Sequence, residues 1–179
     1  MKYRSAIFLD RDGVLNQVTL VNGRPYPPED LSNVKVIPGV IEAIGLLREL
    51  SFEIVVVTNQ PDVSRGFTSK KQVEEINSYL GEILDIQHFF TCFHDDKENC
   101  ECRKPKSGLL LQAAEELQLD LPSSFMVGDR WRDIQAGQDA GCTCFFIDYS
   151  YFEKQPEGQF FTVTSLSEAS IAIEKILGK

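Results

Sequence analysis

The sequence lacks long apolar segments and an excess of basic residues, and each absence excludes a class of protein. Its apolar runs, such as 54–57 and 108–111, are far shorter than the ~20 residues of a membrane span, and the first four residues lack the apolar core of a signal peptide. The net charge of −9 disfavours a nucleic-acid backbone as the main partner, because such binding depends on Lys and Arg. We therefore expect a cytoplasmic protein with no membrane or nucleic-acid partner.

The sequence also lacks a linker rich in Pro, Gly and Ser, and it shows no internal repeat. A chain of 179 residues is long enough for one well-buried core. Hydrophobic residues make up 42% and charged residues 25% of the chain, the balance of an ordinary globular domain. We therefore predict a single domain over residues 1–179, and we expect a monomer.

Cysteine is scarce, with five residues, but three of them lie within eleven residues of the chain together with a histidine. The group is Cys92, His94, Cys100 and Cys102, with one, five and one residues between successive members. Thiolates and an imidazole in one short loop match a tetrahedral zinc site, and four protein ligands leave no open position for a catalytic water. The pattern predicts a structural Zn²⁺ site; the alternative is a loop with three free thiols.

Short apolar runs alternate with segments of helical period along the chain, a pattern typical of a parallel sheet covered by helices. Expected strands are 6–9, 52–57, 89–91, 125–127 and 143–147, and expected helices begin near Pro38 and Ser69 and cover 107–117, 131–140 and 165–177. The predicted fold class is therefore α/β, a three-layer, Rossmann-like parallel sheet with helices on both faces. Residues 149–163 show no clear period and receive no assignment.

The helix expected to begin at Ser69 has two further signals. Gln72 stands three residues after Ser69, the spacing of a capping box. Four apolar residues then recur at helical spacing and are interpreted as a core-facing stripe: Val73, Ile76, Leu80 and Ile83.

Polar side chains stand where the expected strands end. Carboxyl ends of parallel strands meet at one edge of an open sheet, where such folds bind ligands. A single acidic pair at a strand end is as easily a turn or a helix cap, but here four chain segments agree. Their residues are Asp10 and Asp12, then Thr58, Asn59 and Gln60, then Arg103 and Lys104, and finally Asp129, Arg130 and Asp133.

These segments resemble the four motifs of the haloacid dehalogenase superfamily, in the expected order, and the resemblance covers nearly the whole chain. The most specific signatures are Asp-Arg-Asp-Gly at 10–13, Thr-Asn-Gln at 58–60 and Cys-Arg-Lys-Pro at 102–105. They are similar to the capless branch that includes phosphatases of D,D-heptose 1,7-bisphosphate and of histidinol phosphate. A zinc loop also occurs in that branch.

The resemblance implies a Mg²⁺-dependent phosphatase that acts through an aspartyl phosphate. Asp10 would be the nucleophile and Asp12 the general acid and base, and side chains two residues apart on an extended segment point the same way. Magnesium would be held by Asp10, the backbone carbonyl of Asp12 and Asp129. Lys104 would supply a second cation, and Thr58 would donate its hydroxyl to a phosphoryl oxygen.

The same resemblance gives candidates for substrate contact, namely Asn16, Asn59, Gln60, Arg103 and Arg130. Asp133 is expected to orient Lys104 or a water on the metal, although an acid in the first turn of a helix is nearly as good an interpretation. For Arg65, an ordinary solvated surface residue is the favoured interpretation. The expected substrate is a small phosphorylated metabolite.

The connections between these elements bear on that substrate. Only 21 residues separate Asn16 from Pro38 and only eight separate Gln60 from Ser69, too few for a folded cap domain. We therefore expect an open site that takes heptose 1,7-bisphosphate or a related sugar phosphate. The alternatives are histidinol phosphate, whose amine Asp62 could bind, and a non-catalytic zinc-stabilised interaction module.

Overall fold

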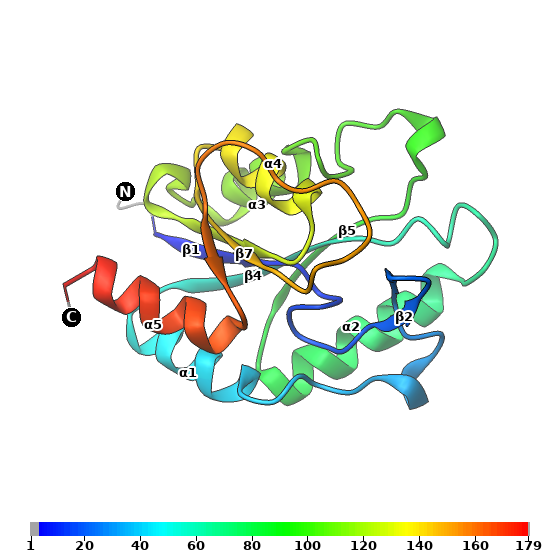
Figure 1. Ribbon diagram of the computed structural model, residues 1–179, viewed down its shortest axis with the longest axis horizontal. Helices are drawn as coiled ribbons and strands as arrows, with labels where there is room; N and C mark the ends of the chain where they lie inside the picture. The colour runs from blue at the N-terminus through cyan, green and yellow to red at the C-terminus, as the bar shows by residue number, and fades with distance from the viewer. Residues whose placement is uncertain (1–3, 179) are drawn as a thin grey trace.

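A six-stranded parallel sheet forms the middle of three layers in the computed structural model, which describes residues 4–178 (Figure 1). The strand order is β5-β4-β1-β6-β7-β8, and every neighbouring pair is parallel. The strands are β1 (Ala6–Leu9), β4 (Glu53–Asn59), β5 (His88–Cys92), β6 (Phe125–Gly128), β7 (Thr143–Ile147) and β8 (Phe161–Val163). The predicted α/β fold class is confirmed.

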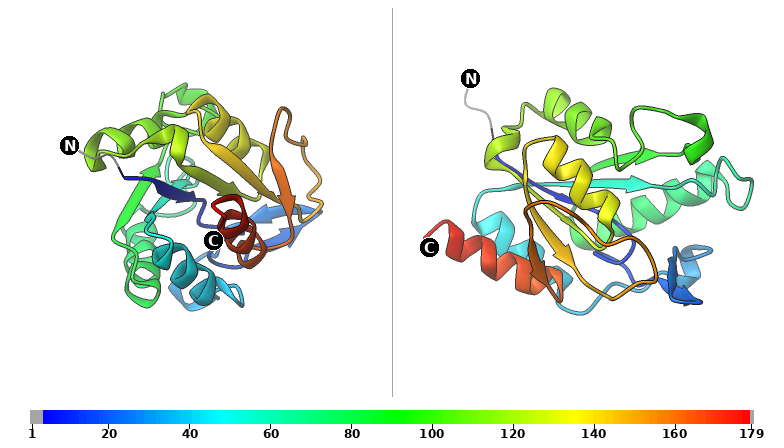
Figure 2. Two further views of the ribbon diagram at one scale, coloured as in Figure 1. Left: turned by 90° about the vertical axis from the view of Figure 1, so that its left-hand side faces the viewer. Right: turned by 45° about the horizontal axis from the view of Figure 1, so that its top comes forward.

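Helices cover both faces of this sheet (Figure 2). One face carries α1 (Val40–Glu49), α2 (Lys70–Leu84) and α5 (Leu166–Ile176), and the other carries α3 (Gly108–Leu117) and α4 (Trp131–Asp139). Three short 3₁₀ helices, η1 (Leu31–Asn33), η2 (Asp96–Glu98) and η3 (Leu121–Ser123), lie in the connections. None of the helices in residues 4–178 is long and apolar enough to cross a membrane.

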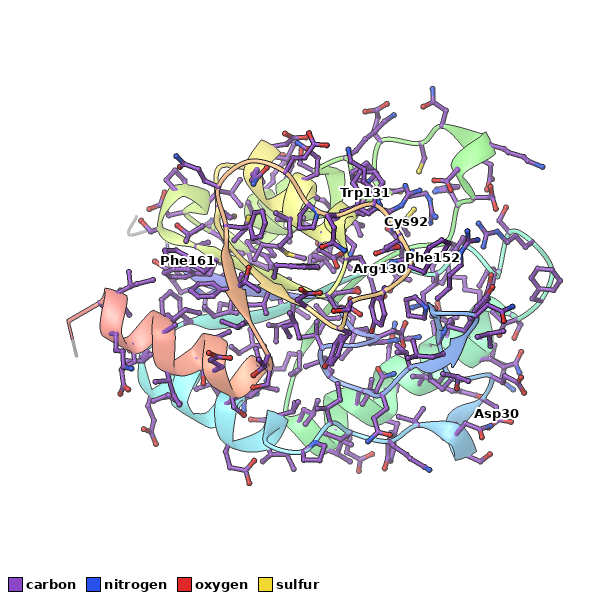
Figure 3. The ribbon with its side chains drawn as sticks, viewed as in Figure 1. Asp30, Cys92, Arg130, Trp131, Phe152 and Phe161 are labelled. Carbon is purple, nitrogen blue, oxygen red and sulfur yellow. The ribbon has the colours of Figure 1, made fainter. Side chains whose placement is uncertain are left out.

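Three strands have no counterpart among the predicted ones. The connection after β1 contains an antiparallel hairpin of β2 (Thr19–Val21) and β3 (Arg24–Tyr26), and β8 lies in the segment that received no assignment. The hairpin turn has the sequence Asn22-Gly23, which is a strong local signal for a two-residue hairpin turn. Phe152, from the segment before β8, lies beside this hairpin (Figure 3).

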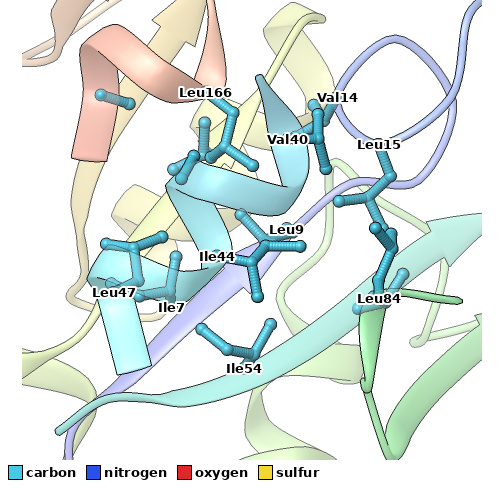
Figure 4. Close-up of a cluster of buried hydrophobic side chains, with 14 of the residues drawn as sticks. Ile7, Leu9, Val14, Leu15, Val40, Ile44, Leu47, Ile54, Leu84 and Leu166 are labelled. Carbon is cyan, nitrogen blue, oxygen red and sulfur yellow. The ribbon is translucent and has the colours of Figure 1, made fainter. Parts of the chain in front are cut away.

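The core follows from the alternation of side chains along β1, since successive residues of a strand face opposite sides of the sheet. Ile7 and Leu9 pack toward α1, α2 and α5, and Ala6 and Phe8 pack toward α3 and α4. Figure 4 shows Ile7 and Leu9 against Ile44 of α1. All four residues of β1 are fully buried, which places the strand that carries the first motif at the centre of the domain.

The start of α2 confirms the capping box, because the Ser69 hydroxyl accepts from the Gln72 amide and the Gln72 side chain accepts from the Ser69 amide. The predicted apolar stripe was wrong at Ile83, which is 37% exposed, whereas Leu84 is 3% exposed. At 100° per residue, Leu84 lies about 20° from Val73 around the helix and Ile83 about 80°. Within the described residues, no connection holds a folded cap domain.

Candidate active site

A cavity of about 380 Å³ opens at the carboxyl ends of the central strands. It collects most of the residues that the sequence analysis singled out: Asp10, Asp12, Asn59, Arg103, Lys104, Asp129, Arg130 and Asp133. Three other candidates, Asn16, Thr58 and Gln60, are almost completely buried and are not part of its lining. The convergence at one edge is therefore as expected, with these three residues buried behind the lining.

Lys104 lies at the centre of the buried charges and is 1% exposed. Its Nζ donates to Asp10 Oδ1 over 2.9 Å and to the carbonyl oxygen of Val57 over 2.7 Å, and it lies 2.6 Å from Asp133 Oδ1. Burial opposes the charge, but the two carboxylates outweigh burial and raise the pKa of Lys104 above its usual value. Lys104 is therefore a permanent cation beside Asp10.

Asp133 serves in both of the ways considered from the sequence. One oxygen binds Lys104, and the other, Oδ2, accepts the backbone amide of Arg130 over 3.0 Å at the start of α4. The side chain is 2% exposed. Asp133 is therefore tied both to Lys104 and to the first turn of its own helix.

Asp10 and Asp129 bring carboxylate oxygens within 4.8 Å of each other. The pKa of Asp10 is raised to about 6: burial is the largest cause, Lys104 opposes it, and the charges of Asp133 and Asp12 add to it. Burial also raises the pKa of Asp129 well above its usual range, with the charge of Asp10 as the next cause. Two buried carboxylates this close need another positive charge to remain ionised together.

A metal ion fits this requirement. One oxygen each of Asp10, Asp129 and Asp133 can be chosen so that all lie within 4.8 Å of one another. Asp129 Oδ2 accepts the Tyr151 hydroxyl over 2.9 Å, whereas the buried Oδ1 has no hydrogen-bond partner within residues 4–178. An unpaired buried carboxylate oxygen is costly unless a cation takes it, and hard oxygen ligands suit Mg²⁺.

Gly13 is required by the position of Asp129. Its φ is +88°, and a Cβ built there would lie 1.9 Å from Asp129 Oδ2 and 2.5 Å from Asp129 Cγ. No side chain fits in that space, and L-residues rarely adopt that φ. The chain after Asp12 therefore turns directly beneath the carboxylate of Asp129.

Asp12 is fixed by three side chains. Arg11 contacts both of its oxygens, with Nη2 3.0 Å from Oδ2 and Nε 3.2 Å from Oδ1. Asn16 Nδ2 donates to Oδ1 over 2.9 Å, and Gln60 Nε2 donates to Oδ2 over 2.7 Å. Asn16 and Gln60, which were expected to contact substrate, thus hold the acid/base candidate.

Arg11 was missed by sequence reasoning. It is 1% exposed, and its Nη1 donates to Asn77 Oδ1 in α2 over 2.9 Å. An arginine between two aspartates suggests a solvated charge, and its buried partner lies 66 residues away in the chain. No local signal could have identified it.

Thr58 and Asn59 end β4 beside the lysine. Thr58 Oγ1 accepts from Gln60 Nε2 over 2.9 Å. Asn59 donates to the carbonyl oxygen of Lys104 over 2.9 Å and accepts its amide over 3.1 Å. Asn59 therefore fixes the backbone at Lys104, so that the side chain enters the buried cluster from a fixed point.

The arginines around the cavity mostly have acidic partners. Arg103 Nε lies 2.8 Å from Asp96 Oδ1, and Arg132 Nη1 lies 3.2 Å from the same oxygen.

Two more arginines of the cavity are paired in the same way. Arg130 forms a bidentate ion pair with Glu153, and Arg65 pairs with Asp62 and Asp95. These partner acids are spread over three connections, and none of the pairs was predicted from the sequence. Arg65 lines the cavity, so it is more than an isolated surface residue.

The Cys/His group is assembled at the end of β5. Cys102 Sγ lies 3.1 Å from Cys92 Sγ and 3.5 Å from Cys100 Sγ, and His94 Nδ1 lies 3.3 Å from Cys102 Sγ. All four ligand atoms lie within 4.8 Å of one another and no disulfide joins the cysteines. Four donors at these separations surround a point in the manner of a tetrahedral metal site, so the group could hold an ion.

Comparisons with known proteins agree with this geometry. Residues 26–141 match the family model of haloacid dehalogenase-like hydrolases. The D-glycero-beta-D-manno-heptose-1,7-bisphosphate 7-phosphatase of Haemophilus influenzae is 39% identical over 143 residues, 74% of either chain. The enzyme of the same name from Helicobacter pylori strain 26695 is 37% identical over 146 residues, 78% of this chain and 81% of the other.

A solved structure is similar over almost the full length. The crystal structure of D,D-heptose 1,7-bisphosphate phosphatase from B. bronchiseptica, complexed with magnesium and phosphate, superimposes with a TM-score of 0.81 at 27% identity. The match covers 97% of this chain and 98% of that one.

Proposed function

The chain belongs to the haloacid dehalogenase-like hydrolases and is a phosphatase of that family; from this premise we propose that it removes the 7-phosphate of D-glycero-beta-D-manno-heptose 1,7-bisphosphate. The observation that carries the proposal is the buried cluster of Asp10, Lys104 and Asp129 at the end of β1. Relatives that span about three quarters of the chain have this activity in their names, which supports the choice of substrate.

In the first step, an oxygen of Asp10 attacks the phosphorus atom while the bond from phosphorus to the sugar oxygen breaks. Asp12 gives its proton to that leaving oxygen, so the sugar departs as a neutral alcohol. In the second step, Asp12 takes a proton from water, and the water oxygen attacks the phosphorus of the aspartyl phosphate. The bond to Asp10 breaks, which releases phosphate and restores both carboxyl groups.

The remaining residues of the cluster set the charge for these steps. Lys104 holds one Asp10 oxygen and neutralises charge at the reacting group, and Thr58 can donate its hydroxyl to a phosphoryl oxygen. Arg11, Asn16 and Gln60 hold Asp12 in one orientation, as their hydrogen bonds to its two oxygens indicate. A proton donor whose side chain is already oriented loses less conformational entropy in the transition state.

The proposed Mg²⁺ ligands are Asp10, Asp129 and the carbonyl oxygen of Asp12. That carbonyl accepts no hydrogen bond from the residues that the structure describes, and Asp129 Oδ1 is unpaired. Bound there, the ion would supply positive charge to the phosphoryl oxygens and allow Asp10 and Asp129 to be ionised together. Asp133 is left out of the ligand set because its two oxygens bind Lys104 and the start of α4.

For the Cys/His group we propose structural Zn²⁺. Thiolates and imidazole are the ligands that zinc prefers, and the four donors leave no position for a reacting water. The role would be mechanical, because Arg103 and Lys104 directly follow Cys102 and their direction depends on this loop.

Replacing Cys100 by serine should reduce bound zinc from about one ion per chain to a small fraction, because the hydroxyl is a poor substitute for a thiolate ligand. We expect lower thermal stability and a higher KM before any effect on the chemical step. Elemental analysis measures the bound zinc, thermal unfolding measures the stability, and steady-state kinetics measure KM. Cys142→Ser is the matched control, since Cys142 lies outside the cluster; equal loss of metal in both variants would contradict the assignment.

Histidinol phosphate is less well supported. Its ammonium group would need a free carboxylate, and Asp62 was the candidate. Asp62 Oδ1 lies 3.3 Å from Arg65 Nη1, so this carboxylate already has a cationic partner. The proposed substrate therefore remains the bisphosphorylated heptose.

A comparison of substrates with Mg²⁺ present tests the proposal. We expect kcat/KM for heptose 1,7-bisphosphate to exceed that for heptose 7-phosphate and for histidinol phosphate by about tenfold or more, the effect of roughly 1.4 kcal/mol in transition-state binding. Release of inorganic phosphate gives the rates. A preference for histidinol phosphate would overturn the substrate, and no turnover of any phosphate ester would overturn the mechanism.

A further inference from the structure

The cavity has no formal net charge from its lining residues. Six cations line it, namely Arg24, Arg65, Arg103, Lys104, Arg130 and Arg132, together with six carboxylates, namely Asp10, Asp12, Asp62, Asp96, Asp129 and Asp133. A substrate with two phosphate groups places negative charge at two separate positions in the cavity. Its reacting phosphate has Lys104 beside the nucleophile, but the other phosphate needs a cation that is not already neutralised.

Five of the six cations have acidic partners. Lys104 pairs with Asp10 and Asp133, Arg103 and Arg132 share Asp96, and the others pair as described above. Arg24 differs, because no acid within residues 4–178 lies within ion-pair distance of it. It is exposed and lines the cavity, so its guanidinium meets an incoming anion without first leaving a carboxylate.

Arg24 is also held in place by the backbone. It directly follows the hairpin turn, in which Asn22 and Gly23 have φ of 53° and 74°, the positive values that a tight two-residue turn of type I′ requires. The carbonyl oxygen of Gly23 accepts the amide of Phe152 over 2.8 Å. The tip of the hairpin is therefore attached to the segment beside the active site (Figure 3).

That segment is itself attached to the reacting groups. Tyr151 donates to Asp129 over 2.9 Å, and Glu153 pairs with Arg130. Phe152 lies between them in the chain and binds the hairpin. Three consecutive residues thus connect the backbone at Arg24 to the carboxylate of Asp129 and to Arg130, so the hairpin presents the arginine at the cavity from a backbone that is held in place.

Resting on the proposed function, we infer that Arg24 is a specificity-determining residue that binds the second phosphate of the substrate, the one that the enzyme leaves in place. Arg103 and Arg130 were the earlier candidates for this contact, but each already has a carboxylate partner. A guanidinium can give a phosphate two parallel hydrogen bonds, which suits a terminal phosphate with three oxygens.

Arg24→Ala should raise KM for heptose 1,7-bisphosphate about tenfold or more and leave kcat within about twofold, because the contact is made equally in the ground and transition states. Its kcat/KM for p-nitrophenyl phosphate, which has one phosphate, should stay within about twofold of the wild type. Arg24→Lys keeps the charge, so its KM for heptose 1,7-bisphosphate should lie between those of the wild type and of Arg24→Ala. The matched control is Lys35→Ala, which removes an exposed cation from the same connection but outside the cavity lining.

A second measurement does not depend on the heptose. Glucose 1,6-bisphosphate and glucose 6-phosphate are tested as competitive inhibitors of p-nitrophenyl phosphate hydrolysis. In Arg24→Ala, the inhibition constant should rise about tenfold for the bisphosphate and stay unchanged for the monophosphate. Equal inhibition constants for the two sugars in the wild type, or the same values in Arg24→Ala and Lys35→Ala, would overturn the inference.

The two measurements separate the proposals. If the wild type prefers heptose 1,7-bisphosphate and Arg24→Ala keeps that preference, the role of Arg24 is wrong and the proposed function stands. If the wild type shows no activity on the heptose but its inhibition by the bisphosphate depends on Arg24, the proposed substrate is wrong and the role of Arg24 stands.

Discussion

Replacing Asp10 by asparagine is expected to lower kcat by about 10⁴-fold or more, because the amide keeps the shape of the side chain and loses the nucleophilic charge. Asp10 is 8% exposed and lies 2.9 Å from Lys104 Nζ, so the charge that asparagine removes is the one beside the lysine at the end of β1. Phosphate release under saturating substrate measures the effect. Formation of a beryllium fluoride adduct on Asp10 in the wild type, and its loss in the variant, provides a direct readout of the nucleophile.

The fold should survive this change. Burial raises the pKa of Asp10 to about 6, so the carboxylate is held at a cost that asparagine does not have. Lys104 retains Asp133 as its partner. We therefore expect unfolding temperatures within a few degrees of the wild type. A folded Asp10→Asn protein with turnover within about tenfold of the wild type would exclude the mechanism, since a lost nucleophile costs several kcal/mol.

Lys104→Met should abolish activity and lower the free energy of unfolding. The substitution leaves the buried carboxylates of Asp10 and Asp133 facing each other without their shared cation, and breaking a buried ion pair in this way costs about 3–5 kcal/mol. Without the lysine, Asp10 would hold its proton more tightly and would be a poorer nucleophile. Urea unfolding and kcat on an aryl phosphate measure the two losses.

The double variant Lys104→Met, Asp133→Asn separates the two effects. Removing the second carboxylate reduces the repulsion, so part of the lost stability should return, while activity should not. Stability that stays at the level of the single variant would mean that Asp133 is not coupled to the lysine. Activity in either variant close to that of the wild type would show that the cation beside Asp10 is dispensable.

The fold and the gathering of the motifs were predictable for one reason. In a parallel sheet all strands end at the same edge, so residues that follow separate strands, such as Asp10, Asn59 and Asp129, meet there whatever the details of the helices. The Cys/His group was predictable because its spacing confines four ligands to one loop. Both patterns depend on short stretches of chain and on the parallel arrangement.

The contacts between connections were not predictable in the same way. Arg11 is buried because Asn77 of α2 accepts its hydrogen bond, and Glu153 pairs with Arg130 from a segment without periodicity. Pairs of this kind depend on where distant loops lie after folding, and a single sequence carries no signal for that. The hairpin is a different case. Its Asn22-Gly23 turn could have been predicted from the sequence, whereas its place beside the cavity could not.

Gly13 shows how a site can depend on empty space. The carboxylate of Asp129 occupies the volume that any side chain at position 13 would need, so even one methyl group there would push aside a ligand of the proposed metal. In a mutational scan, position 13 should behave like a catalytic position although it has no chemistry of its own. A search for active residues by their functional groups would miss position 13. We nevertheless expect substitutions there to be tolerated as poorly as substitutions of the carboxylates.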